Sequence, residues 1–232
     1  MKTKGLIPRS WRFLKKLFLI LFIGQFVYII ILKWVNPPVT ITQLANWFGG
    51  YGLKRDYVDK EDISKYAKLA VISSEDQLFA DHKGFDWKSI EKAMEYNKRK
   101  PNRVHGASTI SQQVAKNVFL WQSRSWVRKA LETYFTFMIE LTWGKKRILE
   151  MYLNVSEMGP GVFGIEAAAR HYFHKSASHL NRAEAARIAA CLPNPKKFIA
   201  QPAGRYVSNR SIIIQRQMYN LSDDPDIQAI IQ

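Results

Sequence analysis

The chain has 232 residues, of which 47% are hydrophobic and 23% are charged, so it suits one globular domain with an appendage and not a disordered, collagen-like or coiled-coil protein. Its 35 Lys and Arg residues outnumber its 19 Asp and Glu residues and give a net charge of +16, which indicates an anionic partner: nucleic acid, a membrane surface or phosphate groups. The only cysteine, Cys191, excludes an intramolecular disulfide and a metal site built from several cysteines.

The N-terminal segment has the pattern of a membrane anchor. The first 50 residues contain no Asp or Glu, and basic residues such as Lys2, Lys4 and Lys16 precede an apolar run over residues 17–35. As a helix this run has a length of roughly 28 Å, close to the hydrocarbon thickness of a bilayer. A cleaved signal peptide is the alternative, but the run continues into Lys33-Trp34 and not into the small residues of a cleavage site.

The distribution of charge around the anchor predicts the topology. Basic residues flank the cytoplasmic ends of membrane helices, so we expect residues 1–16 in the cytoplasm, residues 17–35 in the membrane and residues 36–232 as one domain on the outer side. A domain on that side does not meet DNA. We therefore expect no nucleic-acid partner, and the anionic partners that remain are lipid surfaces and phosphate groups.

Helical periodicity dominates the segment after residue 36. Apolar residues recur at helical spacing after Asp86 and over residues 110–118, 131–138 and 148–152. Asn181 followed by Glu184 predicts a capped helix start before an Ala-rich stretch. Because β-type alternation is scarce, the sequence predicts a mainly α domain.

Two adjacent acids, Glu75 and Asp76, follow an apolar stretch over residues 67–72. A carboxylate at the end of a buried helix is partly desolvated, which raises its pKa and suits it to general-base chemistry near neutral pH. A surface acid at a helix end is the plainer interpretation, and the spacing alone does not decide between the two.

The segment Gly106–Asn117 combines glycine and small hydroxyls with a following helix. Free N–H groups at such a helix start bind anions, and Thr109, Gln113 and Lys116 share one face of the predicted helix, which suits a diphosphate. A capping box formed by Thr109 and Gln112 explains part of the same pattern without a ligand. Both interpretations stay open.

Two further segments concentrate charge on predicted helices. Arg128 and Glu132 are four residues apart, which fits either an ordinary ion pair or a second carboxylate held among cations. Residues 145–147, Lys-Lys-Arg, lie at a helix start, where cations oppose the helix dipole. We therefore expect an anionic group to offset them.

Aromatic residues gather around residues 119–137. Trp121 and Trp126 flank Arg124 and lie near Arg128, a mixture that suits docking at a membrane interface as well as a plain hydrophobic core. The pair His171 and His174 has metal-like spacing but no third ligand nearby, so we do not expect a zinc site.

Taken in order, these segments resemble the peptidoglycan glycosyltransferase family, the polymerase module that also occurs in bifunctional penicillin-binding proteins. The motifs that carry the resemblance are EDQLFADHKGFD at 75–86, GASTISQQVAKN at 106–117, RKALE at 128–132, KKRILEMYLN at 145–154 and GVFGIEAAARHYFHK at 161–175. The resemblance covers about residues 60–200 and is strongest to the monofunctional enzymes of Gram-negative bacteria. Ser111 stands where the family often has threonine.

The resemblance implies a lysozyme-like helical domain with a smaller hydrophobic subdomain that dips into the membrane. It implies polymerisation of lipid II into glycan strands, with inversion at the anomeric carbon and without a covalent glycosyl-enzyme. Glu75 is then the general base on the acceptor 4-hydroxyl, and Glu132 is a second acid near the donor diphosphate.

The resemblance also implies substrate contacts, cofactors and partners. The implied substrate-binding residues are Asp76, Phe79, His82, Gly106, Ser108, Thr109, Gln113, Lys116, Asn117, Arg128, Lys129, Lys145 and Asn154. A divalent cation, Mg²⁺ or Mn²⁺, is expected near the diphosphate with Glu132 as its ligand. The expected partners are lipid II, the lipid-linked strand, membrane lipid and other cell-wall synthesis or division proteins, at the periplasmic face of the inner membrane.

Two other functions fit parts of the pattern. A lysozyme-like enzyme that cleaves peptidoglycan shares a catalytic Glu, but its sugar leaving group needs an acid, whereas here cations surround the expected site. A membrane-anchored cell-wall scaffold explains the anchor and the charge, but it has no use for Glu75 and Glu132.

Overall fold

The computed structural model describes residues 6–100, 106–123 and 125–232, with side chains from residue 10 onward. The basic residues Lys2 and Lys4, and Arg124 between the two tryptophans, lie outside the described residues. The chain divides into two compact units, residues 1–36 and 37–232, and each is described by itself.

The first unit consists of helix α1, Leu6–Ile31. Its segment Ser10–Ile31 is long and apolar enough to cross a membrane, with a length of about 33 Å. The helix starts before the expected anchor and ends at Ile31, and turns replace it over residues 32–34. Most of its apolar side chains are exposed within the protein, as for a helix that faces lipid.

The second unit is mainly helical, as the sequence predicts. Over all the residues that the structure describes, both units together, helix makes up 65% and strand 3%. Its first half contains α2 Ile41–Phe48, β1 Lys54–Arg55, the 3₁₀ turn η1 Lys60–Asp62, α3 Lys65–Glu75, α4 Trp87–Arg99 and α5 Ile110–Phe119. Its second half contains α6 Trp126–Thr142, α7 Lys145–Val155, β2 Glu157–Gly159, β3 Val162–Phe163, α8 Ile165–Phe173, η2 Ala177–His179, α9 Arg182–Cys191, α10 Arg205–Leu221 and α11 Pro225–Ile231.

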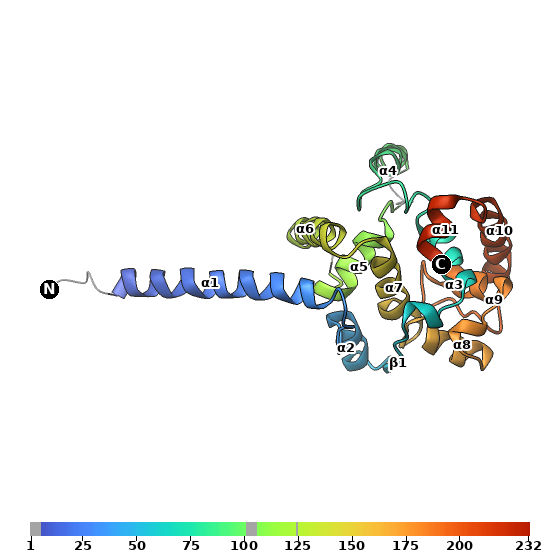
Figure 1. Ribbon diagram of the computed structural model, residues 1–232, viewed down its shortest axis with the longest axis horizontal. Helices are drawn as coiled ribbons and strands as arrows, with labels where there is room; N and C mark the ends of the chain where they lie inside the picture. Colours follow the sequence, from blue (N-terminus) through green and yellow to red (C-terminus); the bar gives the residue numbers. More distant parts are fainter. Residues whose placement is uncertain (1–5, 101–105, 124) are drawn as a thin grey trace. The chain divides into compact units, whose positions relative to one another are not determined.

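Two groups of packed helices form the core of this unit (Figure 1). In one group α3 packs against α9 and α10, and in the other α5 packs against α6 and α7. The helices bury their apolar faces between them, including Ile72 of α3, Ile110 of α5 and Ile148 of α7, each with no exposed surface. Helix α4 has no buried side chain among its residues and lies at the edge of the unit (Figure 1).

The predicted helix starts are confirmed. Asp86 caps α4 by accepting from the Ser89 amide, and Asn181 forms a capping box with Glu184 at the start of α9. The repeat over residues 110–118 is the buried face of α5. The free backbone amides at these helix starts are hydrogen-bonded by side chains within one helical turn, which explains why the local pattern predicts the starts.

A small sheet was not predicted. Its order is β1-β3-β2, with β1 parallel and β2 antiparallel to β3. The strands have two or three residues, too few for a visible alternation. Gly161 before β3 has a φ of +67°, and a Cβ there would lie 2.1 Å from the Tyr51 carbonyl oxygen, so this crossing of two chain segments requires glycine.

Candidate active site

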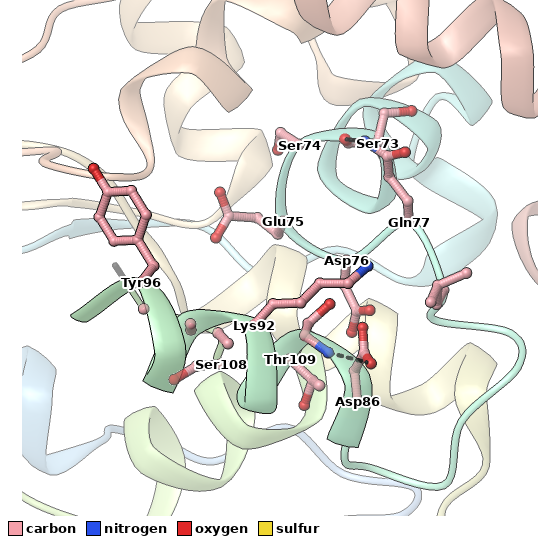
Figure 2. A pocket seen from close by; sticks show the side chains of 15 residues that line it. Ser73, Ser74, Glu75, Asp76, Gln77, Asp86, Lys92, Tyr96, Ser108 and Thr109 are labelled. Atoms are coloured by element: carbon pink, nitrogen blue, oxygen red, sulfur yellow. Dashed lines mark hydrogen bonds between the residues drawn. The ribbon is translucent and has the colours of Figure 1, made fainter. Parts of the chain in front are cut away.

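The two acids at the end of α3 point in different directions. Asp76 is directed toward Thr109 and Asp86, whereas Glu75 is directed toward the side where Tyr96 lies (Figure 2). The Oε2 atom of Glu75 accepts a hydrogen bond of 2.8 Å from Nε2 of Gln113. Burial raises the pKa of Glu75, and the Gln113 hydrogen bond opposes that rise. Glu75 is therefore a carboxyl group suited to accept a proton.

Asp76 joins α3 to the start of α5. Its carboxylate lies 2.9 and 3.0 Å from Nε2 of His82 and accepts from the Ile110 amide at 3.0 Å. The Gly84 amide donates to Nδ1 of His82, so Nε2 carries the ring proton and donates to Asp76. The anion at the start of α5 is thus the Asp76 carboxylate and not a ligand.

Thr109 is the N-cap of α5 and forms the expected capping box with Gln112. Its hydroxyl donates to the Gly84 carbonyl at 2.7 Å, and its side chain is 3% exposed. The expectation of free amides at this end is wrong for Ile110 and Gln112, because Asp76 and Thr109 already accept from them. The long-range hydrogen bond from the Ile110 amide to Asp76, the residue after α3, closes a site that looked open in the sequence.

The next turns of α5 carry two residues that face the acids. Gln113 donates to Glu75 and accepts from the Tyr152 hydroxyl of α7 at 3.3 Å. Burial lowers the pKa of Lys116, the charge of Glu132 opposes this, and the charge of Glu75 opposes it more weakly. Lys116 therefore lies within electrostatic reach of both carboxylates.

Glu132 on α6 is buried, and two partly exposed cations of the same helix bind it. Arg128 donates to its Oε2 at 2.7 Å and Lys129 pairs with its Oε1, and the side chains of Glu132 and Arg128 are 4% and 13% exposed. The i, i+4 pair is thus real but desolvated, unlike a surface pair. Nε of Arg128 is buried and has no hydrogen-bond partner among the described residues. This N–H is available to an anionic ligand.

The donor set around Glu132 does not fit a divalent cation held by the protein. Both carboxylate oxygens already bind the cationic side chains of Arg128 and Lys129. In the part of the chain that the structure describes, no group of three His, Cys, Asp or Glu residues converges. Such a cation needs several oxygen ligands, which the described residues do not bring together around Glu132.

Two of the expected substrate contacts, Phe79 and Lys145, lie against each other. The Lys145 ammonium pairs with Glu140 at 2.7 Å and lies 4.5 Å from the centre of the Phe79 ring. Arg147 pairs with Glu150, so the anionic groups that offset this cluster come from the chain itself.

Asn154 is fully buried and holds an extended segment against α7. Its Oδ1 accepts from the Val58 amide, and its Nδ2 donates to the carbonyls of Val58 and Glu150. With these partners and no exposed surface, Asn154 holds the chain in place and does not face a ligand.

One cavity adjoins the two acids, and a second adjoins Gln113 and Lys116. A cavity of about 610 Å³ next to Glu75 and Asp76 includes Gly106, Ser108 and Thr109 in its wall (Figure 2). A second cavity, of about 360 Å³, is lined on α5 and α7 by the side chains of Gln113, Lys116, Asn117 and Tyr152. The structure thus brings together Glu75, Gln113 and Lys116 with the α6 group Arg128, Lys129 and Glu132.

Two residues at the site were not singled out from the sequence. Tyr152 lies inside a recognised motif but looks like one more apolar position of its helix. Arg210 of α10 lies after the five motifs that carry the resemblance, donates to the Ser74 carbonyl at 3.4 Å and helps to oppose the pKa rise of Glu75. No local pattern connects either residue with α3.

The aromatic residues around α6 divide between core and surface. Leu120 is buried and Phe119 stacks on Phe135, which fits the core interpretation. Trp126 is 91% exposed and Phe137 is 58% exposed, which leaves them outside the core.

Comparison with known proteins shows the family of the chain. Residues 41–219 match the transglycosylase family. The chain belongs to this family. Proteins described as biosynthetic peptidoglycan transglycosylases from Shigella boydii, Escherichia coli and Shigella sonnei are each 55% identical to it over 190 residues. The match covers 80% of this chain and 78% of each relative. The candidate site of this transglycosylase lies within the matched region, as does Arg210.

Proposed function

We propose that the chain polymerises lipid II into glycan strands for the bacterial cell wall, by inverting transfer of the lipid-diphosphate-linked strand to the 4-hydroxyl of an acceptor lipid II. As a member of the transglycosylase family, the chain is a peptidoglycan glycosyltransferase. The observation that carries the proposal is the pairing of one carboxylate of raised pKa, Glu75, with a separate cluster of cations around Glu132.

Glu75 is the group that removes the proton from the acceptor hydroxyl. A general base must be unprotonated yet basic enough to take a proton, and burial moves the pKa of Glu75 toward the working pH. Gln113 holds the carboxylate in one orientation and opens no route for the proton, because its amide only donates to Oε2. The attacking oxygen then forms the new glycosidic bond as the bond to the diphosphate breaks.

The cations stabilise the charge that develops on the leaving diphosphate. Lys116 and Arg128 approach from α5 and α6, and the buried Nε–H of Arg128 is not used by the described residues. A diphosphate leaves as an anion, so fixed positive charge assists it without proton donation. Glu132 holds the Arg128 and Lys129 side chains in place through two charge-assisted bonds.

The experiment that tests the proposal uses the full-length protein in detergent with labelled lipid II, and separately with preformed glycan strands. Formation of polymer from lipid II supports the proposal. Cleavage of the strands indicates a lysozyme-like enzyme instead, and no reaction with either substrate indicates a scaffold.

The membrane anchor determines where this chemistry takes place. Helix α1 and the family assignment fit a membrane-anchored protein. We place the anchor in the inner membrane and the domain in the periplasm, because the cations lie on the N-terminal side of the apolar run. A reporter fused after Gln232 that is active only outside the cytoplasm supports this orientation, and activity inside the cytoplasm contradicts it.

Membrane lipid and other cell-wall synthesis or division proteins are the further partners that we propose. The exposed Trp126 and Phe137 near basic residues of α6 suit contact with an anionic bilayer, since indole rings favour the membrane interface.

A further inference from the structure

A hydrogen-bonded chain connects Glu75 with a tyrosine in the core. The Tyr152 hydroxyl donates to Oε1 of Gln113 at 3.3 Å, and Nε2 of Gln113 donates to Oε2 of Glu75 at 2.8 Å. Tyr152 is 1% exposed and belongs to α7, Gln113 belongs to α5, and Glu75 ends α3. Three helices from the two packed groups therefore contribute one residue each.

The chemistry of the amide makes this order significant. An ionised carboxylate only accepts hydrogen bonds, so the NH₂ end of Gln113 has to face it. The carbonyl end then needs a donor on the other side, and the Tyr152 hydroxyl supplies one. Burial raises the pKa of Tyr152 well above its ordinary value, and the charge of Glu75 raises it further, so the hydroxyl keeps its proton.

We propose that Tyr152 is a positioning residue for the proposed glycosyl transfer: it fixes the orientation of the Gln113 amide, so that Gln113 always donates to Glu75. Without the hydroxyl, the amide has no partner for its carbonyl and is free to rotate by half a turn. In the rotated state its oxygen faces Glu75, which favours the protonated carboxyl group. A protonated Glu75 takes no proton from an acceptor.

The surroundings of Glu75 do not replace this hydrogen bond. The ionisable groups around Glu75 are Asp76 beside it, Lys116 of α5, Tyr152 of α7 and Arg210 of α10, and the same cavity is also lined by Asp86, Lys92 and Tyr96. The cations favour the ionised form of Glu75 but do not act on the rotation of the amide. Among the described residues, Gln113 is the neutral side chain that donates directly to the carboxylate.

The test compares the wild-type protein with Tyr152→Phe, which removes only the hydroxyl. The pKa of Glu75 is measured directly by ¹³C NMR titration of the side-chain carboxyl groups, with Glu75→Gln identifying the signal. We expect the pKa to rise by about 0.5 to 1 unit, the effect of one hydrogen bond of ordinary strength. The acid limb of the pH–rate profile moves up equally, so the rate on that limb falls about three- to tenfold while KM stays nearly constant.

Tyr172→Phe is the matched control. Tyr172 of α8 is also a buried tyrosine whose hydroxyl donates to a carbonyl, that of Met158 at 3.5 Å, and burial raises its pKa to about 12. Removal of the Tyr172 hydroxyl tests whether deleting any buried tyrosine hydroxyl affects the enzyme. We expect this variant to have wild-type activity and a wild-type pH profile. Measurements are made at a temperature at which circular dichroism shows both variants folded.

A double variant distinguishes action through Gln113 from an independent effect. In a Gln113→Ala background, Tyr152→Phe should change neither the pKa of Glu75 nor the pH profile further. An unchanged Glu75 titration in Tyr152→Phe, or an undiminished effect of that change in the Gln113→Ala background, overturns the inference. The titration needs no activity, so failure of the wild-type protein to form polymer refutes the proposed function and leaves this test intact.

Discussion

Replacing Glu75 with Gln removes the proposed base and preserves its size and one hydrogen bond. Nε2 of Gln113, 2.8 Å from Oε2 of Glu75, still has an amide oxygen to donate to. General-base catalysis contributes about 10²- to 10⁴-fold, so we expect polymerisation to slow by that factor, or about 3 to 5.5 kcal/mol in activation free energy. Binding of lipid II should be nearly unchanged, because a base that acts in the transition state adds little to ground-state affinity.

The raised pKa of Glu75 also predicts the sign of the change in stability. Between its unfolded and its folded pKa, the folded state binds more protons than the unfolded state, so the stability from this group falls as the pH rises through that window. Above the folded pKa the penalty is complete. Gln carries no charge and avoids this penalty, so Glu75→Gln should be at least as stable as the wild-type protein at neutral pH.

The assay follows polymer formed from labelled lipid II, with lipid II binding and urea unfolding measured on the same preparations. Glu61→Gln is the control, because Glu61 is a surface acid paired with Lys60 and its side chain is 70% exposed. Near-normal strand synthesis by a folded Glu75→Gln protein would refute the assignment. Loss of activity together with loss of stability would refute the claim that Glu75→Gln removes the base without destabilising the fold.

Three other outcomes follow from the contacts described. Lys116→Ala and Arg128→Ala should each weaken lipid II binding about ten- to 100-fold and also lower kcat, because these cations contact the diphosphate in the ground state and in the transition state. A lower kcat with an unchanged KM would argue against this role. Asp76→Asn should lower the free energy of unfolding by about 1.5–3 kcal/mol in urea titrations, because the carboxylate accepts from His82 and from the Ile110 amide; equal stability would contradict it. A protein lacking residues 1–35 should fold and bind anionic vesicles less tightly at high salt, with Trp126→Ala binding more weakly; binding that ignores salt would count against the interfacial role.

The ends of the helices were predictable because their partners are local. Thr109 and Gln112 cap α5 within one turn, and Asn181 and Glu184 do the same for α9. The pair of Arg128 and Glu132 is also local, and its spacing alone places the two side chains together. A sequence read in windows of one or two turns contains all the information that these contacts need.

The functional geometry was only half predictable, because its remaining contacts join distant segments. Asp76 and the Ile110 amide are 34 residues apart, Tyr152 and Gln113 are 39 apart, and Arg210 reaches a carbonyl 136 residues earlier. The packing of α3, α5, α7 and α10 brings these distant residues together. No single hydrophobic period in the sequence specifies that packing. The motif resemblance therefore placed Glu75 and Asp76 among the site residues but did not predict that Asp76 accepts from the Ile110 amide of α5.

The order of the two acids at the end of α3 limits how this site tolerates change. The double substitution Glu75→Asp with Asp76→Glu leaves composition, net charge and helix length unaltered, yet it puts the shorter side chain in the cavity and the longer one under α5. The first no longer spans the distance to Gln113, and the second no longer fits between His82 and the Ile110 amide. In a library of variants, the substitutions tolerated at position 75 should hardly overlap with those tolerated at position 76, although both positions hold a carboxylate.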